Sequence, residues 1–323
     1  MIDRRTLLGS AIATGAALAI GPGAARAQTL DSLKLFVPAA PGGGWDQTAR
    51  SVEQAMKAAG IVTAIQLEHV PGAGGTVGLP RFVNNMKGQA TTMMVSGLVM
   101  VGSIVANKTP VKLTQCVPIA RLTGEYMVLA VPANSPLKTL QDYVAALKKD
   151  PGATATAGGS AGGTDHILLG LIAKAVGADP KKINYVAFAG GGPAQASLLG
   201  GHVVAGISGY GEFGEQIKAG KLRALGITSD KREPGIDTPT FKEQGVDLVV
   251  PNWRGLFAPP GITADQRGKL IAAVEKMAAS PGWQAELEKR GWSGILLTGD
   301  AFGKFVDEET ARIEGVLKEI GLA

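Results

Sequence analysis

Hydrophobic and polar positions follow two alternating patterns along most of the chain. Short apolar runs are typical of buried strands, and longer runs with one apolar face are typical of helices. Their alternation predicts a parallel α/β sheet. We predict strands over 33–37, 65–70, 91–96, 153–157, 183–188, 202–208 and 222–228. We predict helices over 46–59, 76–86, 139–149, 164–176, 193–199, 211–219, 263–279, 282–290 and 300–320.

Two segments interrupt this alternation. Residues 117–132 read as two successive strands around Gly124, and residues 246–260 contain three prolines that disfavour a helix. We expect each segment to cross from one lobe to another, which predicts a hinged protein that closes on a ligand. The predicted division is lobe 1 over 28–124 and 253–323, lobe 2 over 125–252, and crossings near 120–130 and 246–256.

Four glycine-rich loops each follow a predicted strand and precede a predicted helix. Glycines leave backbone N–H groups unshielded, and the first turn of a helix adds free N–H groups and a partial positive charge. Such a corner binds anions, although one glycine run alone is a weak motif that also serves plain turns. Four loops in two pairs predict two lobes that face one anionic ligand. They are PGGGWD (41–46), PGAGGTVG (71–78), GGSAGGTD (158–165) and AGGGPA (189–194).

Residues 1–27 have the pattern of a cleaved export signal. A positive start is followed by an apolar run and by the small-residue site Ala25-Arg26-Ala27. The pair Arg4-Arg5 resembles a twin-arginine signal, and an ordinary secretory signal is the alternative. No later segment is apolar for long enough to span a bilayer. We therefore expect a soluble protein in the periplasm.

Composition and charge exclude several classes of function. The chain is 45% hydrophobic and 18% charged, as in folded soluble proteins. Removing the signal lowers the net charge from +5 to +3, and no basic stripe for nucleic acid remains. Cys116 is the single cysteine, so no disulfide forms within the chain, and its apolar setting predicts an inert core thiol. No two histidines have metal-ligand spacing, and we expect neither metal nor cofactor.

The mature chain resembles the solute-binding proteins of tripartite tricarboxylate transporters, the Bug or TctC-like family. The stretches that carry the resemblance are PAAPGGGWDQTAR, VPGAGGTVG, GGSAGGTDH, FAGGGPAQASLLGGHVVAGISG and PNWRGLFAPPG. They are most similar to the TctC-type, tricarboxylate-binding branch. The resemblance implies a monomer with a two-lobed periplasmic-binding-protein fold (Venus flytrap, type II). It would deliver a small di- or tricarboxylate, citrate-like as first choice, to membrane permease subunits.

The resemblance also implies which residues bind the ligand, mainly through backbone N–H groups and hydroxyls. In lobe 1 they are Gly42, Gly43, Gly44, Trp45, Asp46, Gly74, Gly75, Thr76, Ser96 and Gly97. In lobe 2 they are Ser160, Ala161, Gly162, Gly163, Thr164, His166, Gly191, Gly192, Ser208 and Gly209.

Several of these positions have a structural alternative. Asp46 and Asp165 begin helices, where a carboxylate caps free N–H groups, and we expect Asp46 to turn away from an anionic ligand. Trp45 would shape a pocket lid or join the core. His166 would touch the ligand or pack as a structural side chain, and Arg254 would reach the ligand from the hinge or contact the crossing strands.

Other functions fit the sequence less well. Residues 158–162 match the G-x-S-x-G of a serine hydrolase, but the remaining triad, His202 with Asp179, would crowd around Ser160 within a short stretch. No loop has the Gly-Lys-Ser/Thr ending of a nucleotide-binding P-loop. A ligand sensor of the same fold stays open. We therefore predict a binding protein and not an enzyme.

Overall fold

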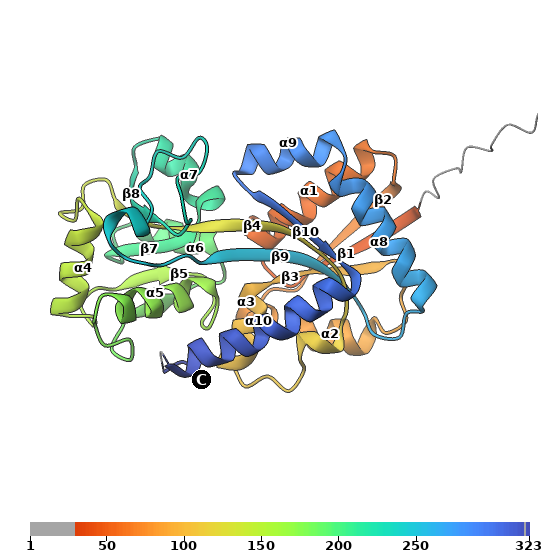
Figure 1. Ribbon diagram of the computed structural model, residues 1–323, viewed down its shortest axis with the longest axis horizontal. Helices are drawn as coiled ribbons and strands as arrows, with labels where there is room; N and C mark the ends of the chain where they lie inside the picture. Colours follow the sequence, from red (N-terminus) through yellow and green to blue (C-terminus); the bar gives the residue numbers. More distant parts are fainter. Residues whose placement is uncertain (1–29, 320) are drawn as a thin grey trace, which may run out of the picture.

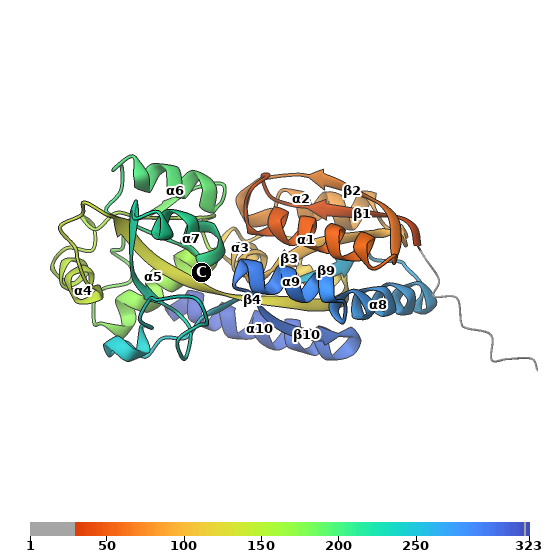
Figure 2. The ribbon, with the colours of Figure 1, turned by 90° about the horizontal axis from the view of Figure 1, so that it is seen from above.

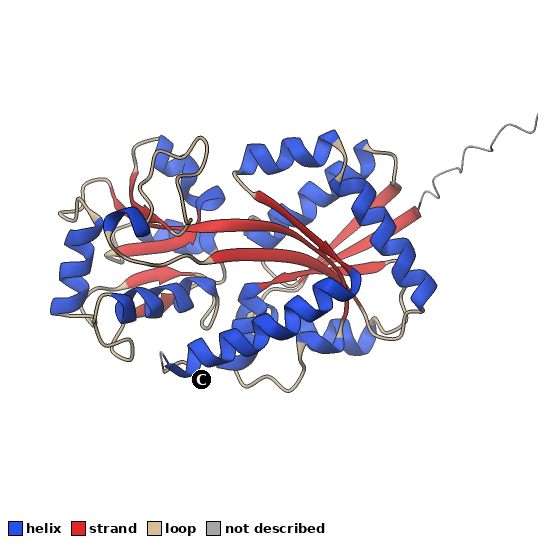
Figure 3. Ribbon diagram, viewed as in Figure 1, coloured by secondary structure: helices blue, strands red, loops and turns tan. Residues whose placement is uncertain are grey.

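Two α/β lobes lie side by side and are joined through the middle of the molecule. The computed structural model describes residues 30–319 and 321–323, so the predicted export signal lies outside the described residues. Two strands, β4 (Val117–Pro132) and β9 (Pro251–Ala258), run along the long axis where the lobes meet (Figure 1). Strands fill the interior and helices cover the outside (Figure 3). The predicted two-lobed fold is confirmed.

The sheet of lobe 1 has the strand order β2-β1-β3-β9-β4-β10. The first three strands are parallel, and β9 then runs antiparallel to both β3 and β4. The further strands are β1 (Leu30–Val37), β2 (Val62–His69), β3 (Thr92–Gly97) and β10 (Ser293–Thr298). The helices are α1 (Gly44–Ala58), α2 (Gly78–Asn85), α3 (Leu98–Ala106), α8 (Ala264–Ala278), α9 (Pro281–Arg290) and α10 (Gly299–Glu319).

The sheet of lobe 2 is built on the second half of β4. Its order is β8-β4-β7-β5-β6, with β7 and β8 antiparallel to β4 and with β5 parallel to its neighbours. The strands are β5 (Thr156–Gly158), β6 (Tyr185–Ala187), β7 (Ala205–Gly209) and β8 (Leu222–Ile227). The helices are α4 (Leu140–Lys149), α5 (Thr164–Ala175), α6 (Gly191–Leu199) and α7 (Tyr210–Lys218).

The prediction of two strands within 117–132 is wrong, because β4 is one strand that serves both sheets. Up to Tyr126 it pairs with β9 and β10, and from Met127 it pairs with β7 and β8. Gly124 does not break it, because this glycine pairs with both neighbouring strands, and the register shifts lie elsewhere, before Thr123 on the β9 and β10 side and between Leu129 and Ala130 on the β8 side. The proposed residue boundaries of the lobes stay a prediction.

The sequence interpretation missed two elements, α3 and β10. Six of the nine residues of α3 are buried, so this helix has no polar face and lacks the period that marks a surface helix. It matters for the site because it lies at the meeting of the lobes, where the Ser103 hydroxyl donates to the Ala161 carbonyl oxygen at 3.4 Å. Strand β10 is short and half exposed, which leaves a weak pattern.

The three C-terminal helices pack against lobe 1, as predicted from their apolar faces. Helix α9 lies against α1, and α8 and α10 contact β4 (Figure 2). An aromatic cluster fixes α10, with Trp253 of β9 packed edge-on against Phe302 and Phe305 at 5.9 and 5.4 Å between ring centroids. At its far end α10 reaches lobe 2, where Glu319 pairs with Lys174.

Candidate functional site

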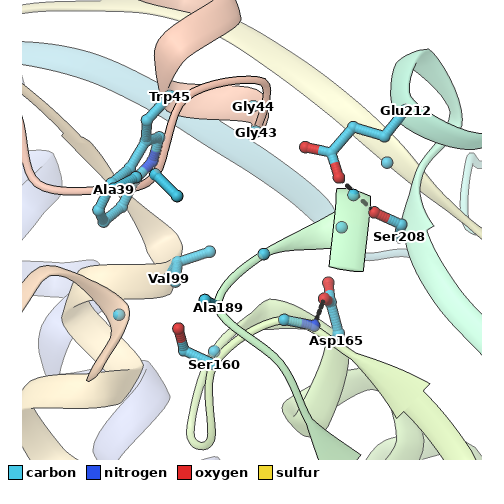
Figure 4. A pocket seen from close by; sticks show the side chains of 18 of the residues that line it. Ala39, Gly43, Gly44, Trp45, Val99, Ser160, Asp165, Ala189, Ser208 and Glu212 are labelled. Carbon is cyan, nitrogen blue, oxygen red and sulfur yellow. Dashed lines mark hydrogen bonds between the residues drawn. The ribbon is translucent and has the colours of Figure 1, made fainter. Parts of the chain in front are cut away.

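A cavity of about 170 Å³ lies between the two lobes. The loops that follow β1, β2, β5 and β6 meet there, together with the end of β7 and the first half of β9 (Figure 4). Ligands of open α/β sheets bind outside the carboxyl ends of strands, and this cavity occupies that place in both lobes. The lining residues are Pro38–Trp45, Gly72–Gly75, Val99, Met127, Gly159, Ser160, Gly163–Asp165, Ala189–Pro193, Ser208, Gly209, Glu212, Asn252 and Arg254.

Asp46 fixes the first glycine loop from behind. Its carboxylate accepts the N–H of Gly42 at 2.8 Å, the Nε–H of Arg50 at 2.9 Å, and lies 2.7 Å from His69 Nε2. Burial opposes the charge, but the hydrogen bonds from Arg50, Gly42 and His69 outweigh it and lower the pKa of Asp46. The side chain is absent from the cavity lining. It caps a loop N–H rather than the N–H groups of its own helix.

Asp165 has the same relation to the third loop, but it lines the cavity. Its Oδ2 accepts the N–H of Gly159 (Figure 4). Burial raises the pKa of Asp165 to about 7. The Gly159 N–H and the Arg254 guanidinium act to lower this pKa, and the carboxylates of Glu212 and Glu125 act to raise it further. Like Asp46, Asp165 caps an N–H group of the loop and not the N–H groups of its own helix.

Trp45 forms an apolar wall of the cavity. Its side chain is 6% exposed and lies beside Ala39 and Val99 (Figure 4). The second glycine loop packs closely on it, since a Cβ at Gly75 would come within 2.8 Å of the indole ring. The residue therefore packs between two loops as part of the cavity wall.

A buried ion pair joins the two crossing strands beneath the cavity. Arg254 of β9 and Glu125 of β4 are 2% and 1% exposed and form a salt bridge. Glu125 also accepts the N–H of Gly211 at 2.9 Å, which links it to the start of α7. The guanidinium lies 5.2 Å from the ring centroid of Trp292. Its Nη1 is buried without a hydrogen-bond partner among the described residues, and such a donor is costly to leave unpaired.

Glu212 brings a second carboxylate to the cavity from α7. The Ser208 hydroxyl donates to its Oε2 at 2.5 Å (Figure 4). Burial raises the pKa of Glu212, the nearby Glu125 carboxylate raises it further, and Arg254 and the Ser208 hydrogen bond act in the opposite direction.

The structure brings most of the predicted binding residues together. Those that line the cavity are Gly42, Gly43, Gly44, Trp45, Gly74, Gly75, Ser160, Gly163, Thr164, Gly191, Gly192, Ser208 and Gly209. The other seven do not line it: Asp46, Thr76, Ser96, Gly97, Ala161, Gly162 and His166. Whether each lining residue touches a ligand stays a prediction.

The residues outside the lining have structural partners instead. The Ser96 hydroxyl is fully buried and donates to Met100 Sδ at 3.2 Å, and the Thr76 hydroxyl donates to the Ala73 carbonyl oxygen at 2.7 Å. The His166 ring stacks on Tyr185 with ring centroids 4.1 Å apart. Burial lowers the pKa of His166 to about 4, so this ring is neutral near pH 7.

Of the remaining four, Gly97, Gly162 and Ala161 are placed by their backbone and Asp46 by its carboxylate. Gly97 lies in the β3–β9 ladder opposite Arg254, where a Cβ would overlap the backbone of Trp253. Gly162 donates its N–H to His166 Nδ1 at 3.2 Å, and the Ala161 carbonyl faces α3. Asp46 lies behind the first loop, as described above.

Sequence reasoning missed Glu212 and Asn252 as lining residues and left Arg254 between two roles. A signal for Glu212 was present, because it follows a predicted strand end by a few residues, as the other site residues do. A charged residue within the apolar crossing segment also needs a partner. That argument could have paired Glu125 with Arg254 on the other crossing.

Two further features bear on the class of protein. No group of three histidine, cysteine, aspartate or glutamate side chains within residues 30–319 and 321–323 is arranged to hold a metal ion. Over the same described part of the chain, none of the helices has both the length and the apolar character that crossing a membrane demands.

The two lobes, the crossing strands and the cavity between them define a periplasmic-type solute-binding protein. The model of the tripartite tricarboxylate transporter family receptor matches residues 48–322. The chain therefore belongs to this family, whose members are solute-binding receptors and not enzymes.

Individual relatives agree with this assignment. Protein BugT of Bordetella pertussis is 28% identical over 294 residues, which cover 90% of this chain and 89% of BugT. A UPF0065 protein of Cupriavidus necator is 28% identical over 206 residues, 64% of this chain, and the match spans 62% of that protein's length. The structure of MatC from Rhodopseudomonas palustris with bound malate has a TM-score of 0.78 at 26% identity, covering 89% of this chain and 99% of MatC.

Proposed function

We propose that this receptor captures a small carboxylate between its lobes in the periplasm. As a monomer it closes on the ligand and hands it to the membrane permease subunits of a tripartite tricarboxylate transporter. The family supports this role, and the malate bound to MatC supports the ligand class. The export signal expected over residues 1–27 supports the location.

The observation that carries the proposal is the buried Arg254 at the wall of the cavity. Glu125 forms a salt bridge with Nη2 of the guanidinium, and Nη1 has no hydrogen-bond partner among the described residues. Nη1 has almost no accessible surface, so the guanidinium would attract a ligand carboxylate through its positive charge from the wall of the cavity. The glycine loops would supply backbone N–H groups around the rest of the ligand.

The number of carboxylates on the ligand follows from the charges of the lining. Among the described lining residues, the charged side chains are Arg254, Asp165 and Glu212. Where Asp165 and Glu212 are ionised, each would repel a further ligand carboxylate. The lining therefore limits the number of ligand carboxylates, and the citrate-like first choice stays a prediction.

A ligand sensor that presents the same closed form to a membrane receptor is the alternative use of this cavity. A serine hydrolase built on Ser160 is not supported, because neither His202 nor Asp179 is among the residues that line the cavity with Ser160.

Thermal unfolding of the mature protein tests the proposal. Residues 28–323 would be unfolded and refolded to remove carried ligand and then heated with mono-, di- and tricarboxylates, and with amino acids as the comparison. A ligand at a hundred times its dissociation constant adds about 2.7 kcal/mol, which is a rise in Tm of about 5 °C for a chain of this size. If no carboxylate raises the Tm, the proposal is wrong.

A further inference from the structure

The walls of the cavity carry more acidic than basic side chains. Arg254 is the one cation among the described lining residues, and its guanidinium is shared with the buried Glu125 in a salt bridge. Asp165 and Glu212 face the same cavity from α5 and α7 (Figure 4), and the Glu125 carboxylate repels both of them. A ligand carboxylate would therefore lie beside two acids, and a nearby like charge favours the protonated form of each.

Of these two acids, Asp165 has the fewer partners for its charge. The residue is 8% exposed, and the one hydrogen bond that its carboxylate accepts within the described residues comes from the Gly159 N–H. The Tyr185 hydroxyl of β6 lies beside it but donates to the Gly159 carbonyl oxygen at 2.7 Å. The neighbouring His166 is neutral near pH 7, and its Nδ1 accepts the Gly162 N–H. A buried charge with so few partners is costly.

Glu212 has better partners for its charge. The Ser208 hydroxyl donates to its Oε2 at 2.5 Å. A Cβ on Gly44 would lie 2.8 Å from Glu212 Oε1 and 2.7 Å from Arg254 Cζ, so this carboxylate lies near the guanidinium and is attracted to it. Burial raises the pKa of Glu212 as well, but Asp165 has no such hydroxyl, and of its charged neighbours Arg254 affects it least.

We propose that the capture of a ligand carboxylate in this cavity is coupled to the uptake of one proton from the solvent by Asp165. The neutral acid no longer repels the ligand, and its O–H becomes a donor where the carboxylate could only accept. This inference rests on the proposed function and adds to it the charge balance of the occupied site.

Ligand affinity should fall as the pH rises. Burial already places the pKa of Asp165 at about 7, and a ligand carboxylate in the cavity would raise it further. Well below pH 7, Asp165 is protonated before the ligand arrives, so binding takes up almost no proton. Above pH 7 the free receptor has lost this proton and must regain it on binding, so the Kd increases with pH.

Isothermal titration calorimetry measures the coupling directly. Malate, succinate, adipate and citrate would be titrated at pH 8 in HEPES and in Tris, because the two buffers differ in heat of ionisation and the difference gives the number of protons bound per ligand. For the wild type we expect an uptake of about 0.5 to 1 proton. We also expect the Kd to rise about threefold or more between pH 7 and pH 8.5.

Two variants assign the proton. Asp165→Asn has the shape of the protonated acid and cannot take up a proton, so its uptake should be close to zero and its Kd constant between pH 7 and pH 8.5. Glu212→Gln removes one repelling charge and leaves Asp165 in place, so its uptake should persist. The matched control is Asp307→Asn, because Asp307 is exposed on α10, and it should take up protons as the wild type does.

The outcomes separate this inference from the proposed function. No uptake, or a release of protons, in the wild type would overturn the inference and leave the carboxylate receptor intact. Uptake that persists in Asp165→Asn would place the proton on another group and overturn it too. Should Asp165→Asn not fold, the wild-type uptake and its persistence in Glu212→Gln carry the same test. Absence of binding by all four acids would overturn the proposed function as well.

Discussion

Replacing Gly43 with leucine should weaken ligand binding without disturbing the fold. Gly43 has φ −80° and ψ 174°, an extended conformation open to any residue. A Cβ there would meet only the Ala40 carbonyl oxygen, at 3.7 Å. Because Gly43 lines a cavity of about 170 Å³, the leucine side chain would take up space that the ligand needs. We expect at least a tenfold rise in Kd, equal to about 1.4 kcal/mol.

Calorimetric titration with the tightest ligand from the carboxylate panel, together with the Tm of each unliganded protein, measures this effect. The control is Gly268→Leu in α8, where the glycine is exposed and a Cβ has open space. Leucine favours a helix over glycine by up to about 1 kcal/mol, so the control should bind normally at an equal or higher Tm. An unchanged Kd for Gly43→Leu would refute the placement of the ligand against the first glycine loop.

Three further perturbations test the hinge and the buried charges. The raised pKa of Asp165, about 7 against 3.8, makes the folded state bind a proton that the unfolded chain has lost. Stability should therefore fall as the pH rises through this window, by at most about 4 kcal/mol, and Asp165→Asn should remove the fall in urea titrations. Glu125→Ala leaves Arg254 buried and unpaired and should cost about 3–5 kcal/mol in the same assay. Gly102→Val would overlap the Gly162 carbonyl oxygen across the lobes, so scattering should show a more open molecule that binds ligand weakly.

The sequence predicted the fold well where pattern and spacing are strong. Short apolar runs followed by glycines located the strands that end at the cavity, and the amphipathic C-terminal helices were found within one or two residues. Helix α3 was not predicted from the sequence, because the helix is apolar on nearly every side. It is buried by α10, the second glycine loop, β3, β9 and α5, and such long-range packing leaves no periodic mark on the segment itself.

Only part of the site was predicted from the sequence. A glycine-rich loop can be recognised from its local sequence, whereas the partners of a buried charge cannot. Gly42–Gly44 and Gly191–Gly192 could be placed at the cavity from their position after a strand. The roles of Glu125, Arg254 and Glu212 arise from three elements far apart in the chain, and only the folded structure brings them together. Asp46 shows the reverse case, since its expected turn away from the ligand followed from charge alone.

The two acids at the helix starts explain how loops so rich in glycine can form a specific site. A glycine loop loses more conformational freedom on ordering than any other segment of equal length. If the loop became ordered only on binding, this loss would lower the affinity for the ligand. Asp46 holds Gly42 and Asp165 holds Gly159 through the loop N–H groups, one such contact in each lobe. The loops are thereby shaped before a ligand arrives. The Asp46 carboxylate also adds negative charge near an anion site, which makes the positive charge of Arg254 in the cavity wall more important for binding.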